Sequence, residues 1–278
     1  MKSSIAVLIT CFNRKEKTLN CLENLFHITN DVDVYLVDDN SNDGTKEAIK
    51  NSFPQVHIIS GNGNLFWNRG MHIAWQTAMS EADYDFFLWL NDDSIPYPYL
   101  LQELLHCSKL KDDKAIISGL IENAEKTKVI YGGRDFERNL IQATGKMESI
   151  RNLNGNVVLV PSVVVKKIGI LDPYFHHDLG DVDYGYRAQK NNIEVVTTER
   201  PVAYGFENPI MRMRLKSSSL KERIKYLYSP LGANPRINFY FRKKYFGYLN
   251  AIMYFCFLHF LNFIPNNLNS KLFGDKYC

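Results

Sequence analysis

The stretch Leu88–Pro96, with the sequence LWLNDDSIP, decides how we interpret the fold. An apolar run with the composition of a buried strand ends there abruptly, at Asn91 followed by Asp92 and Asp93. Neighbouring carboxylates repel each other, and a protein tolerates that repulsion where a cation or a hydrogen-bond donor of a ligand lies between them. The stretch therefore predicts a strand whose carboxyl end forms part of a ligand site.

Two earlier apolar runs end in polar clusters in the same way. Ile5–Thr10 leads into the cluster Thr10–Asn13, and Val32–Val37 leads into Asp38–Ser41. Helical patterns separate the runs, so strands and helices alternate up to about residue 120. This alternation predicts an α/β fold with a parallel sheet and helices on both faces. Because ligands of such sheets bind at the carboxyl ends of the strands, we expect the three clusters to converge on one crevice.

The composition is that of an ordinary globular protein, with 45% hydrophobic and 23% charged residues. Aromatic residues make up 13%, which suits core packing, a sugar-stacking surface or a membrane interface. The 5 cysteines are scattered and show no CxxC spacing, which favours a reducing compartment and gives no zinc site. The apolar run Ile5–Ile9 is short and lacks a small-residue cleavage site, so we interpret it as a buried strand of a cytoplasmic protein and not as a signal peptide.

Charge divides the chain into an acidic body and a basic tail. Residues 206–278 contain 12 Lys or Arg and 3 Asp or Glu, a balance of +9. The preceding 205 residues contain 21 Lys or Arg and 27 Asp or Glu, a balance of −6. This asymmetry indicates two parts with different roles, and the acidic body argues against nucleic acid as a partner.

The tail combines basic clusters with an aromatic run. Met211–Lys225 is rich in Lys and Arg, Arg242–Lys244 follows, and Tyr245–Ile264 then has no acidic residue, Lys or Arg over 20 residues. That run reaches the length of a transmembrane helix, but it is aromatic and includes the polar Asn250 and Asn262. We therefore expect a helix that lies in the interface of an anionic membrane beside a basic patch. The alternative is a C-terminal helix that packs on the rest of the protein.

Two of the strand-end clusters allow more than one interpretation. Asp38–Ser41 is either a capped turn or a place where a carboxylate contacts a base or ribose. Asn91–Asp93 suits Mg²⁺ or Mn²⁺, because such a cation shares oxygen ligands with substrate phosphates and neutralises a leaving diphosphate. The alternative for this cluster is an acidic cap before a helix at Tyr97, which accounts for one Asp better than for the pair.

A further acidic motif, Gly180–Asp183, precedes Arg187. Asp181 is a candidate general base, because a carboxylate near a metal stays ionised and accepts the proton of an attacking hydroxyl. As a helix start, the same motif places two carboxylates at the N-terminal dipole and pairs Asp183 with Arg187. Both interpretations hold together if Asp181 faces the cleft and Asp183 forms the ion pair. His176–His177 is a second metal candidate, although adjacent side chains do not face one way.

Five motifs succeed one another along the chain: Val7–Arg14, Val37–Thr45, Gly61–Gly70, Leu90–Asp93 and His176–Arg187. In this order they resemble the inverting glycosyltransferase family 2. The resemblance implies the GT-A fold, a Rossmann-like, mixed, mainly parallel sheet with helices on both faces. Within that family the chain looks like the bacterial rhamnosyltransferase-like branch, which builds surface polysaccharides. The resemblance covers residues 3 to about 205.

The resemblance implies a site for a nucleotide-activated sugar. It assigns nucleotide or donor binding to Thr10, Asn13, Asp38, Asp39, Arg69 and Asp92. It assigns the metal, Mn²⁺ or Mg²⁺, to Asp93 and the role of catalytic base to Asp181. In the mechanism that it implies, Asp181 deprotonates an acceptor hydroxyl, which attacks the anomeric carbon from the face opposite the nucleotide. The metal stabilises the departing diphosphate.

We therefore expect a metal-dependent inverting glycosyltransferase, with a GT-A catalytic domain over residues 1–205 and a helical, membrane-associating region over residues 206–278. Its donor would be a dTDP- or UDP-sugar, rhamnose by family resemblance, and its acceptor a saccharide or a lipid-linked group. It would lie in the cytoplasm at the inner face of the cell membrane. Two features depart from the family: Gly180 stands where many relatives have Glu, and Val202–Asn208 lacks the late His of many metal-dependent transferases.

Two alternatives stay open. A nucleotidyltransferase on a related fold would need a glycine-rich, basic loop after the first strand, and Thr10–Asn13 contains no glycine. A non-catalytic subunit that binds sugar nucleotides would keep Asp38 and Asp93 but would not need Asp181. Donor hydrolysis by the wild type and by an Asp181→Asn variant would separate this second alternative from the enzyme.

Overall fold

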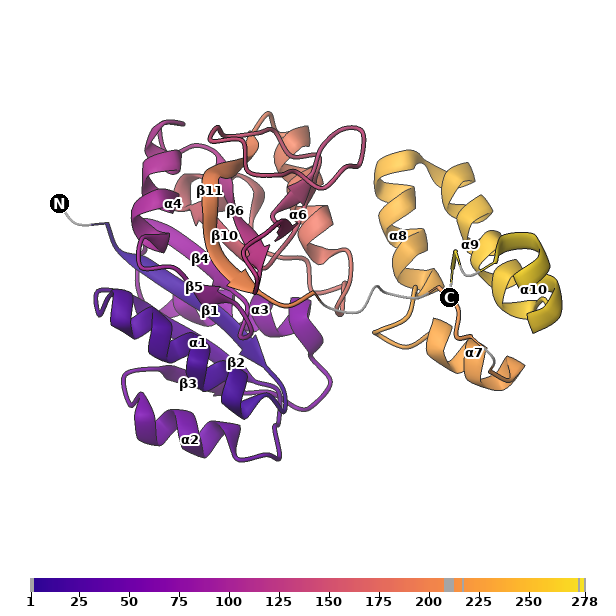
Figure 1. The fold of residues 1–278 in the computed structure, drawn as a ribbon, viewed down its shortest axis with the longest axis horizontal. Helices are drawn as coiled ribbons and strands as arrows, with labels where there is room; N and C mark the ends of the chain where they lie inside the picture. The colour runs from indigo at the N-terminus through magenta and orange to yellow at the C-terminus, as the bar shows by residue number, and fades with distance from the viewer. Residues whose placement is uncertain (1–2, 208–212, 217, 275, 278) are drawn as a thin grey trace. The chain divides into compact units, whose positions relative to one another are not determined.

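The computed structural model describes residues 3–207, 213–216, 218–274 and 276–277. The chain forms two compact units, whose elements Figure 1 labels. One, the sheet unit, comprises Met1–Pro173 and Gly180–Glu207. The other, the helical unit, comprises Tyr174–Leu179 and Asn208–Cys278. The short segment Tyr174–Leu179 therefore belongs with the C-terminal residues, although the sheet unit precedes and follows it in the sequence.

Within the described residues, a nine-stranded sheet forms the frame of the sheet unit. Its strands are β1 Ile5–Cys11, β2 Asp33–Asp38, β3 His57–Ser60, β4 Phe86–Leu90, β5 Ile95–Pro96, β6 Ile116–Asn123, β7 Val129–Tyr131, β10 Val157–Pro161 and β11 Val195–Gly205. The order is β3-β2-β1-β4-β10-β6-β11-β5, and β7 pairs with β6. The first four strands in this order are parallel, whereas β10 runs antiparallel to both of its neighbours. A separate two-stranded sheet joins β8 Gly133–Arg134 to β9 Asn152–Leu153.

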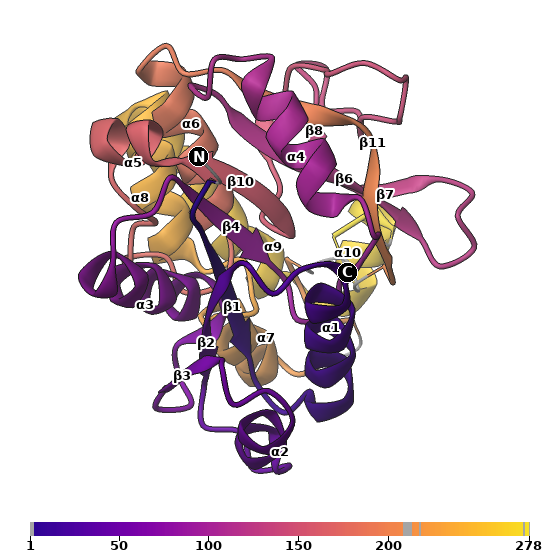
Figure 2. The same ribbon diagram turned by 90° about the vertical axis from the view of Figure 1, so that its left-hand side faces the viewer.

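Helices cover both faces of this sheet (Figure 2). They are α1 Lys15–Ile28, α2 Thr45–Ser52, α3 Phe66–Glu81, α4 Leu100–Lys109, α5 Ser162–Ile168 and α6 Gly180–Lys190. One hydrophobic cluster contains residues of α1, α2 and α4, and another contains residues of α3, α5 and α6. Alternate residues of β1 divide between the two clusters, with Val7 and Ile9 in the first and Ala6 and Leu8 in the second. Because both faces are covered, the central strands are continuous apolar runs. The predicted α/β fold is confirmed.

The helical unit consists of four helices in its described residues. They are α7 Leu220–Leu227, α8 Pro235–Phe246, α9 Tyr248–Phe263 and α10 Asn266–Phe273. Local sequence sets their ends, since Ser219 and Glu222 form a capping box at the start of α7. Helix α9 packs against α7 and α8, and Leu227 and Leu258 belong to the small apolar core.

The aromatic run Tyr245–Ile264 does not form a single helix. It contains the last residues of α8, then Gly247, then all of α9. Gly247 has φ of +87°, a conformation that glycine adopts without strain, and it separates the two helices. Helix α9 consequently has 16 residues, fewer than the roughly 20 that a bilayer requires. In the part of the chain that the structure describes, no helix is both long enough and apolar enough to cross a membrane.

Two arginines of the predicted basic patch are buried. Arg214 and Arg223 are 1% and 5% exposed. They donate hydrogen bonds to carbonyl oxygens at the C-terminal end of α9, namely those of Leu261 and Asn262. A helix C-terminus leaves such carbonyls without partners in the helix, and cations satisfy them well. The predicted surface patch is therefore wrong for these two residues, and Arg212, another of its members, lies outside the described residues.

Candidate active site

The carboxyl ends of β2, β1 and β4 lie side by side at one edge of the sheet. Cys11 pairs with Asp38 across β1 and β2, and Leu8 pairs with Trp89 across β1 and β4. Because the three strands are parallel, the residues that follow them share this edge. The structure thus brings together the three polar clusters that the sequence places after these strands. We call the residues at and just after the carboxyl ends of β1, β2 and β4 the strand-end site; it comprises Thr10–Arg14, Asp38–Ser41 and Asn91–Asp93.

A guanidinium group lies between the two carboxylates that follow β4. Nη1 of Arg14 is 3.2 Å from Oδ1 of Asp92 and 2.9 Å from Oδ2 of Asp93. The Asp92 side chain is 6% exposed and that of Asp93 is 13% exposed, whereas that of Arg14 is 42% exposed. Oγ1 of Thr18 donates a further hydrogen bond to Oδ2 of Asp92 over 3.3 Å. Arg14 therefore offsets the repulsion between the neighbouring carboxylates within the protein itself.

Burial dominates the electrostatics of Asp92. It raises the pKa of the Asp92 carboxyl to about 6, although the charge of Arg14 acts in the opposite direction. Burial would lower the pKa of the Arg14 guanidinium, but the charges of Asp92 and Asp93 outweigh it and raise that pKa. Sequence reasoning did not assign Arg14 a role. No local sequence pattern carries a signal for this role, because the pairing of β1 with β4 is what brings Arg14 to Asp92.

Asp39 organises the loop between β3 and α3. Its Oδ1 accepts a hydrogen bond from the amide of Gly63 over 2.8 Å. Its Oδ2 accepts hydrogen bonds from the amides of Leu65 and Phe66, over 2.8 and 3.1 Å. Position 61 requires glycine, because a Cβ on Gly61 would lie 2.6 Å from Oδ1 of Asp39. The buried Asp39 carboxylate therefore fixes the backbone that leads into α3.

Asp38 and Asn13 connect the loops that follow β1 and β2. Oδ1 of Asp38 accepts a hydrogen bond from the amide of Ser41 over 3.0 Å, which is the capped turn expected as one interpretation. Oδ1 of Asn13 accepts from the amide of Asn42 over 2.8 Å, and the Asn13 amide donates to Oγ of Ser41 over 2.9 Å. Asn13 has φ of +51°, a conformation that Asn tolerates better than most residues. These bonds fix the two loops against each other.

Two adjacent residues of α3, Arg69 and Gly70, make different contacts, and Thr10 of β1 takes part in one of them. A Cβ on Gly70 of α3 would lie 2.2 Å from Oγ1 of Thr10, so α3 approaches β1 closely only with glycine at that position. Nε of Arg69 donates a hydrogen bond to the carbonyl oxygen of Pro173 over 2.9 Å. Thr10 therefore faces α3, and Arg69 contacts the chain where the first part of the sheet unit ends.

Asp181 lies in the first turn of α6 and is connected to the carboxylate pair. Its Oδ2 accepts a hydrogen bond from the amide of Gly155 over 2.9 Å. Gly155 lies against Trp67, because a Cβ on this glycine would be 2.4 Å from the indole ring. Nε1 of Trp67 donates a hydrogen bond to Oδ1 of Asn91 over 2.7 Å. Through Gly155 and Trp67, Asp181 is therefore linked to the motif that contains Asp92 and Asp93.

The neighbours of Asp181 explain the local sequence. A Cβ on Gly180 would lie 1.8 Å from Oδ1 of the buried Asn68, so this arrangement of α3 and α6 excludes a Glu at position 180. Asp183 is fully buried, and its Oδ2 is 2.8 Å from Nε of Arg187, which confirms the predicted ion pair. The first turn of α6 thus directs one carboxylate to Arg187 and the other to the Gly155 loop.

The described residues do not supply a full set of ligands for the metal that we expect at Asp93. No group of three or more His, Cys, Asp or Glu side chains that could hold a metal ion is present among the described residues. His176 and His177 belong to the helical unit, whereas Asp93 belongs to the sheet unit. Mg²⁺ typically binds through one or two carboxylates, with water and substrate phosphates completing the shell. The Asp92–Asp93 pair fits a cation of that kind, and does not fit one held by protein ligands alone.

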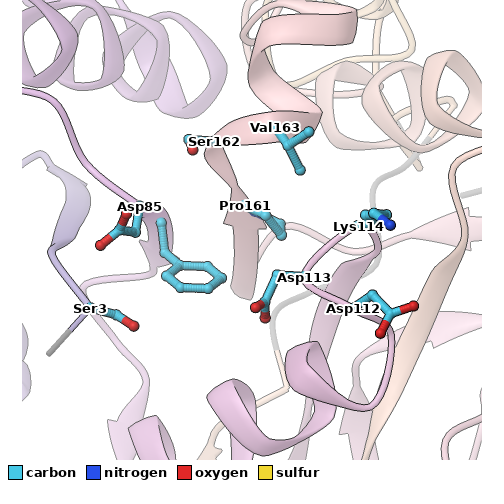
Figure 3. A pocket seen from close by; sticks show the side chains of 9 residues that line it. Ser3, Asp85, Asp112, Asp113, Lys114, Pro161, Ser162 and Val163 are labelled. Atoms are coloured by element: carbon cyan, nitrogen blue, oxygen red, sulfur yellow. The ribbon is translucent and has the colours of Figure 1, made fainter. Parts of the chain in front are cut away.

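A pocket of the sheet unit lies at the opposite edge of the sheet (Figure 3). It has a volume of about 470 Å³, and its lining includes Asp85, Asp113 and Pro161. Asp85 precedes β4 and Pro161 ends the antiparallel β10, whereas Asn91 follows β4, about 20 Å further along the strand direction. This pocket is therefore separate from the strand-end site.

A family model matches the chain over the residues that contain the strand-end site. Its description is glycosyl transferase family 2, and the match runs over residues 6–160, more than half of the chain. The chain belongs to glycosyl transferase family 2. The match contains all three strand-end clusters and ends before Asp181. The family prediction is confirmed, and the rhamnosyltransferase-like branch stays a prediction.

Solved structures share the fold at low sequence identity. The mannosyltransferase PcManGT from Pyrobaculum calidifontis, in complex with GDP-Man and Mn²⁺, is 15% identical, with a TM-score of 0.53 over 76% of this chain and 59% of that one. Residues 1–349 of S. aureus TarS are 13% identical, with a TM-score of 0.52 over 73% of this chain and 60% of that one. A longer TarS structure is 12% identical, with a TM-score of 0.55 over 74% and 37%.

These likenesses concern the fold of part of each relative. The chain spans between 37% and 60% of the length of the three structures. At identities of 12–15%, they support the GT-A fold and do not transfer an activity. A comparison with curated protein sequences found no match.

Proposed function

We propose that this chain is an inverting glycosyltransferase, which moves a sugar from a nucleoside diphosphate to an acceptor hydroxyl. The observation that carries the proposal is the link from Asp181, through Gly155 and Trp67, to the motif of the carboxylate pair. Membership of glycosyl transferase family 2 supports sugar transfer. The neighbour solved with GDP-Man and Mn²⁺ supports a nucleotide-sugar donor and a divalent metal.

In this proposal the loops after β1 and β2 hold the nucleoside. Asp38 and Asn13 lie on loops that are already fixed to each other, so little ordering is needed when the base and ribose bind. Asp92, beside them after β4, is placed to meet the ribose or the sugar. Thr10 and Asp39 support these contacts, since one packs on α3 and the other fixes the loop before it.

The diphosphate would lie where positive charge is available. Arg14 is within hydrogen-bond distance of both carboxylates, and with 42% of its side chain exposed it can also reach an incoming phosphate. Arg69, now bonded to a backbone carbonyl, is a second candidate contact for the diphosphate or the sugar. A Mn²⁺ or Mg²⁺ ion bound at Asp93 would offset the charge of the diphosphate as it leaves.

Asp181 is the proposed catalytic base. The Gly155 amide orients Oδ2 of its carboxylate. The acceptor hydroxyl gives its proton to Asp181, and its oxygen forms a bond to the anomeric carbon. The bond from that carbon to the diphosphate oxygen breaks on the opposite face. The sugar is therefore transferred with inverted configuration.

The finer features of the proposal rest on the family resemblance and on charge. We propose a dTDP- or UDP-sugar as the donor, rhamnose in particular, and a saccharide or lipid-linked acceptor of a bacterial surface polysaccharide. Residues 1–205 would be the catalytic domain. Residues 206–278, with their balance of +9, would hold the protein peripherally at the inner face of the cell membrane, in the cytoplasm.

Thermal unfolding of the purified protein tests the donor site. UDP, dTDP and GDP are compared with and without Mn²⁺, and we expect one of them to raise the melting temperature only in the presence of metal. Asp93→Asn should abolish the shift. Asp112→Asn is the matched control, because Asp112 also stands beside another Asp but is exposed. If no nucleotide binds under any condition, the carboxylate pair is structural and the proposal fails.

Donor turnover tests the catalytic base. Asp181→Asn should lower the rate of nucleoside diphosphate release by about 10²–10⁴-fold, the usual contribution of a positioned base. Nucleotide binding should persist in this variant. Binding without turnover in the wild type, with every acceptor tried, would instead favour a non-catalytic sugar-nucleotide-binding subunit. Unchanged turnover in Asp181→Asn would contradict the role of Asp181.

A further inference from the structure

Helix α9 presents a continuous apolar face to solvent. Its exposed bulky residues recur three, four or seven positions apart, so they fall on one side of the helix. The members of this α9 face are Leu249, Ile252, Met253, Cys256, Phe260 and Phe263. Their exposure is large, for example 71% for Leu249 and 52% for Phe260. The opposite side of the helix supplies the buried residues Ala251, Leu258 and Leu261. A contiguous apolar surface of this kind marks an interaction surface.

Basic residues accompany the α9 face. Between Glu222 and Asp275 the sequence contains seven Lys or Arg and no Asp or Glu. Lys243 and Lys244 lie in the last turn of α8, and Nζ of Lys243 is 5.8 Å from the centre of the Tyr248 ring. Tyr248 begins α9 and is 60% exposed. Lys271 is exposed on the next helix. Cations therefore flank the α9 face in sequence on both sides.

The combination of an apolar face with cations selects one kind of partner. A second copy of the chain, docked face to face, would bring the same cations together and be disfavoured by their repulsion. A nucleic acid would match the cations but offer the apolar side chains no comparable surface. A bilayer with anionic lipids offers an apolar layer beneath negative headgroups, and aromatic side chains are favoured at that boundary.

We propose that the α9 face docks on the surface of a bilayer that contains anionic lipids. Helix α9 lies in the plane of the interface, with Leu249 and Phe260 inserted among the acyl chains. Lys243 and Lys244 contact the headgroups. This inference rests on the membrane attachment proposed above and assigns it to particular side chains. It does not depend on the chemistry of the strand-end site.

Sedimentation with lipid vesicles tests this surface. The full chain should bind vesicles of phosphatidylcholine mixed with phosphatidylglycerol, bind phosphatidylcholine alone weakly, and lose binding as salt is added. The double variant Leu249→Ser and Phe260→Ser should weaken binding at least about tenfold, because two large side chains no longer insert. The double variant Lys243→Gln and Lys244→Gln should weaken it by roughly 10- to 30-fold.

Matched controls come from the sheet unit. Leu110 is 53% exposed and Lys50 is exposed, so Leu110→Ser and Lys50→Gln repeat the same changes on another surface. Both should bind vesicles like the wild type. All variants should keep the thermal shift with nucleotide. Failure of the docking surface and failure of the donor site are thereby distinguished.

A variant that keeps the apolar face provides an independent readout. Phe260→Trp should show a blue-shifted emission on addition of the mixed vesicles, because the indole moves into an apolar layer. The inference is overturned if the wild type binds neither kind of vesicle, or if the serine variant binds as tightly as the wild type. It is also overturned if sedimentation without lipid shows a dimer that the serine variant breaks. Serine is a poorer helix former than leucine, so a small fall in the melting temperature of the serine variant is expected. A fall as large as that of a core substitution would show that the same chain covers this face, and would overturn the inference too.

Discussion

Two of the three pairs of adjacent aspartates in the sheet unit, Asp92–Asp93 and Asp112–Asp113, lie in contrasting surroundings. Asp92–Asp93 follows a buried strand, is 6% and 13% exposed, and is bridged by Arg14. Asp112–Asp113 lies in the turn after α4, where both residues have positive φ, of 53° and 55°. Oδ2 of Asp113 is 3.7 Å from Nζ of Lys109, and the two side chains are 37% and 81% exposed.

The difference in burial between the two pairs shows under which conditions neighbouring carboxylates indicate a ligand site. In the exposed pair, water and salt screen the repulsion, and Asp is favoured for its tolerance of a left-handed backbone. In the buried pair, screening is weak, so a cation or hydrogen-bond donors must lie close by, as Arg14 does here. The dipeptide is therefore informative only at the end of a buried strand. Substitutions at the two pairs, compared one against the other, test this conclusion.

The largest expected difference between the pairs is in turnover. Asp93→Asn should lower the rate of nucleoside diphosphate release by about 10²–10³-fold, because a charge that faces the leaving group is lost. Asp112→Asn should stay within about twofold of the wild type, since it lies outside the strand-end site. The rates are measured with the nucleotide sugar whose nucleotide stabilises the protein. Equal rates for the two variants would show that the buried pair contributes no more to turnover than the pair in the turn after α4.

The pH dependence of stability gives the next largest difference. The pKa of Asp92 in the folded protein is about 6, above its ordinary value of 3.8, so between these values the folded state holds a proton that the unfolded state has lost. Stability of the wild type relative to Asp92→Asn should therefore fall as pH rises from about 4 to about 6, and then stay level. The total change is about 3 kcal/mol.

Chemical denaturation over this pH range, in a buffer with a metal chelator, measures the effect. Asp112→Asn shows how much of any slope comes from losing a carboxylate at an exposed place. The sign is decisive, because a relative stability that rises with pH would mean that Arg14 outweighs burial at Asp92.

Removal of the cation beside each pair should have a smaller effect, which is measured as a change in the free energy of unfolding. Arg14→Gln leaves two neighbouring carboxylates without their bridge, and should lower the free energy of unfolding by about 2 kcal/mol at neutral pH. The cost stays moderate because Asp92 can take up a proton and because Arg14 is itself 42% exposed. Lys109→Gln removes an exposed ion pair within one helix and should change stability by at most about 0.5 kcal/mol.

Added Mn²⁺ sharpens this test in denaturation experiments. If the carboxylate pair binds the cation, Mn²⁺ should raise the stability of Arg14→Gln more than that of the wild type, because the guanidinium no longer competes. An Arg14→Gln variant as stable as the wild type, and indifferent to Mn²⁺, would show that the bridge contributes little.

The fold of the first half could be predicted because its signals are local. The expected strand Ile5–Thr10 is one residue shorter than β1 at its C-terminal end. The expected strand Val32–Val37 starts and ends one residue before β2. Their apolar runs and the helical patterns between them need no information from elsewhere in the chain. By contrast, β5 has two residues and exists through its pairing with β11, and the pairing of β11 with β6 shifts register around Pro201. Such strands depend on distant partners, which a local pattern does not contain.

The same distinction applies to the site. The positions of the three polar clusters follow from strand ends, but Arg14 meets Asp92 across 78 residues of sequence. The role of Asp39 in fixing the loop before α3 also arises from contacts across the edge of the sheet. Chemistry that lies within one motif could be recognised, whereas partners chosen by the order of strands could not.

The smallest expected effect comes from a substitution that disturbs the position of the Asp92–Asp93 pair and leaves its charge unchanged. Trp67→Phe removes the hydrogen bond to Asn91 and loosens the link to Asp181, so turnover should fall about tenfold with nucleotide affinity unchanged. Trp75, on the same helix, is fully buried, and its indole N–H has no hydrogen-bond partner among the described residues. Trp75→Phe should therefore cost about 1–2 kcal/mol of stability and leave turnover intact. If both variants lose turnover equally, the indole at Trp67 acts by filling space, and the link between Asp181 and the carboxylate pair has no catalytic role.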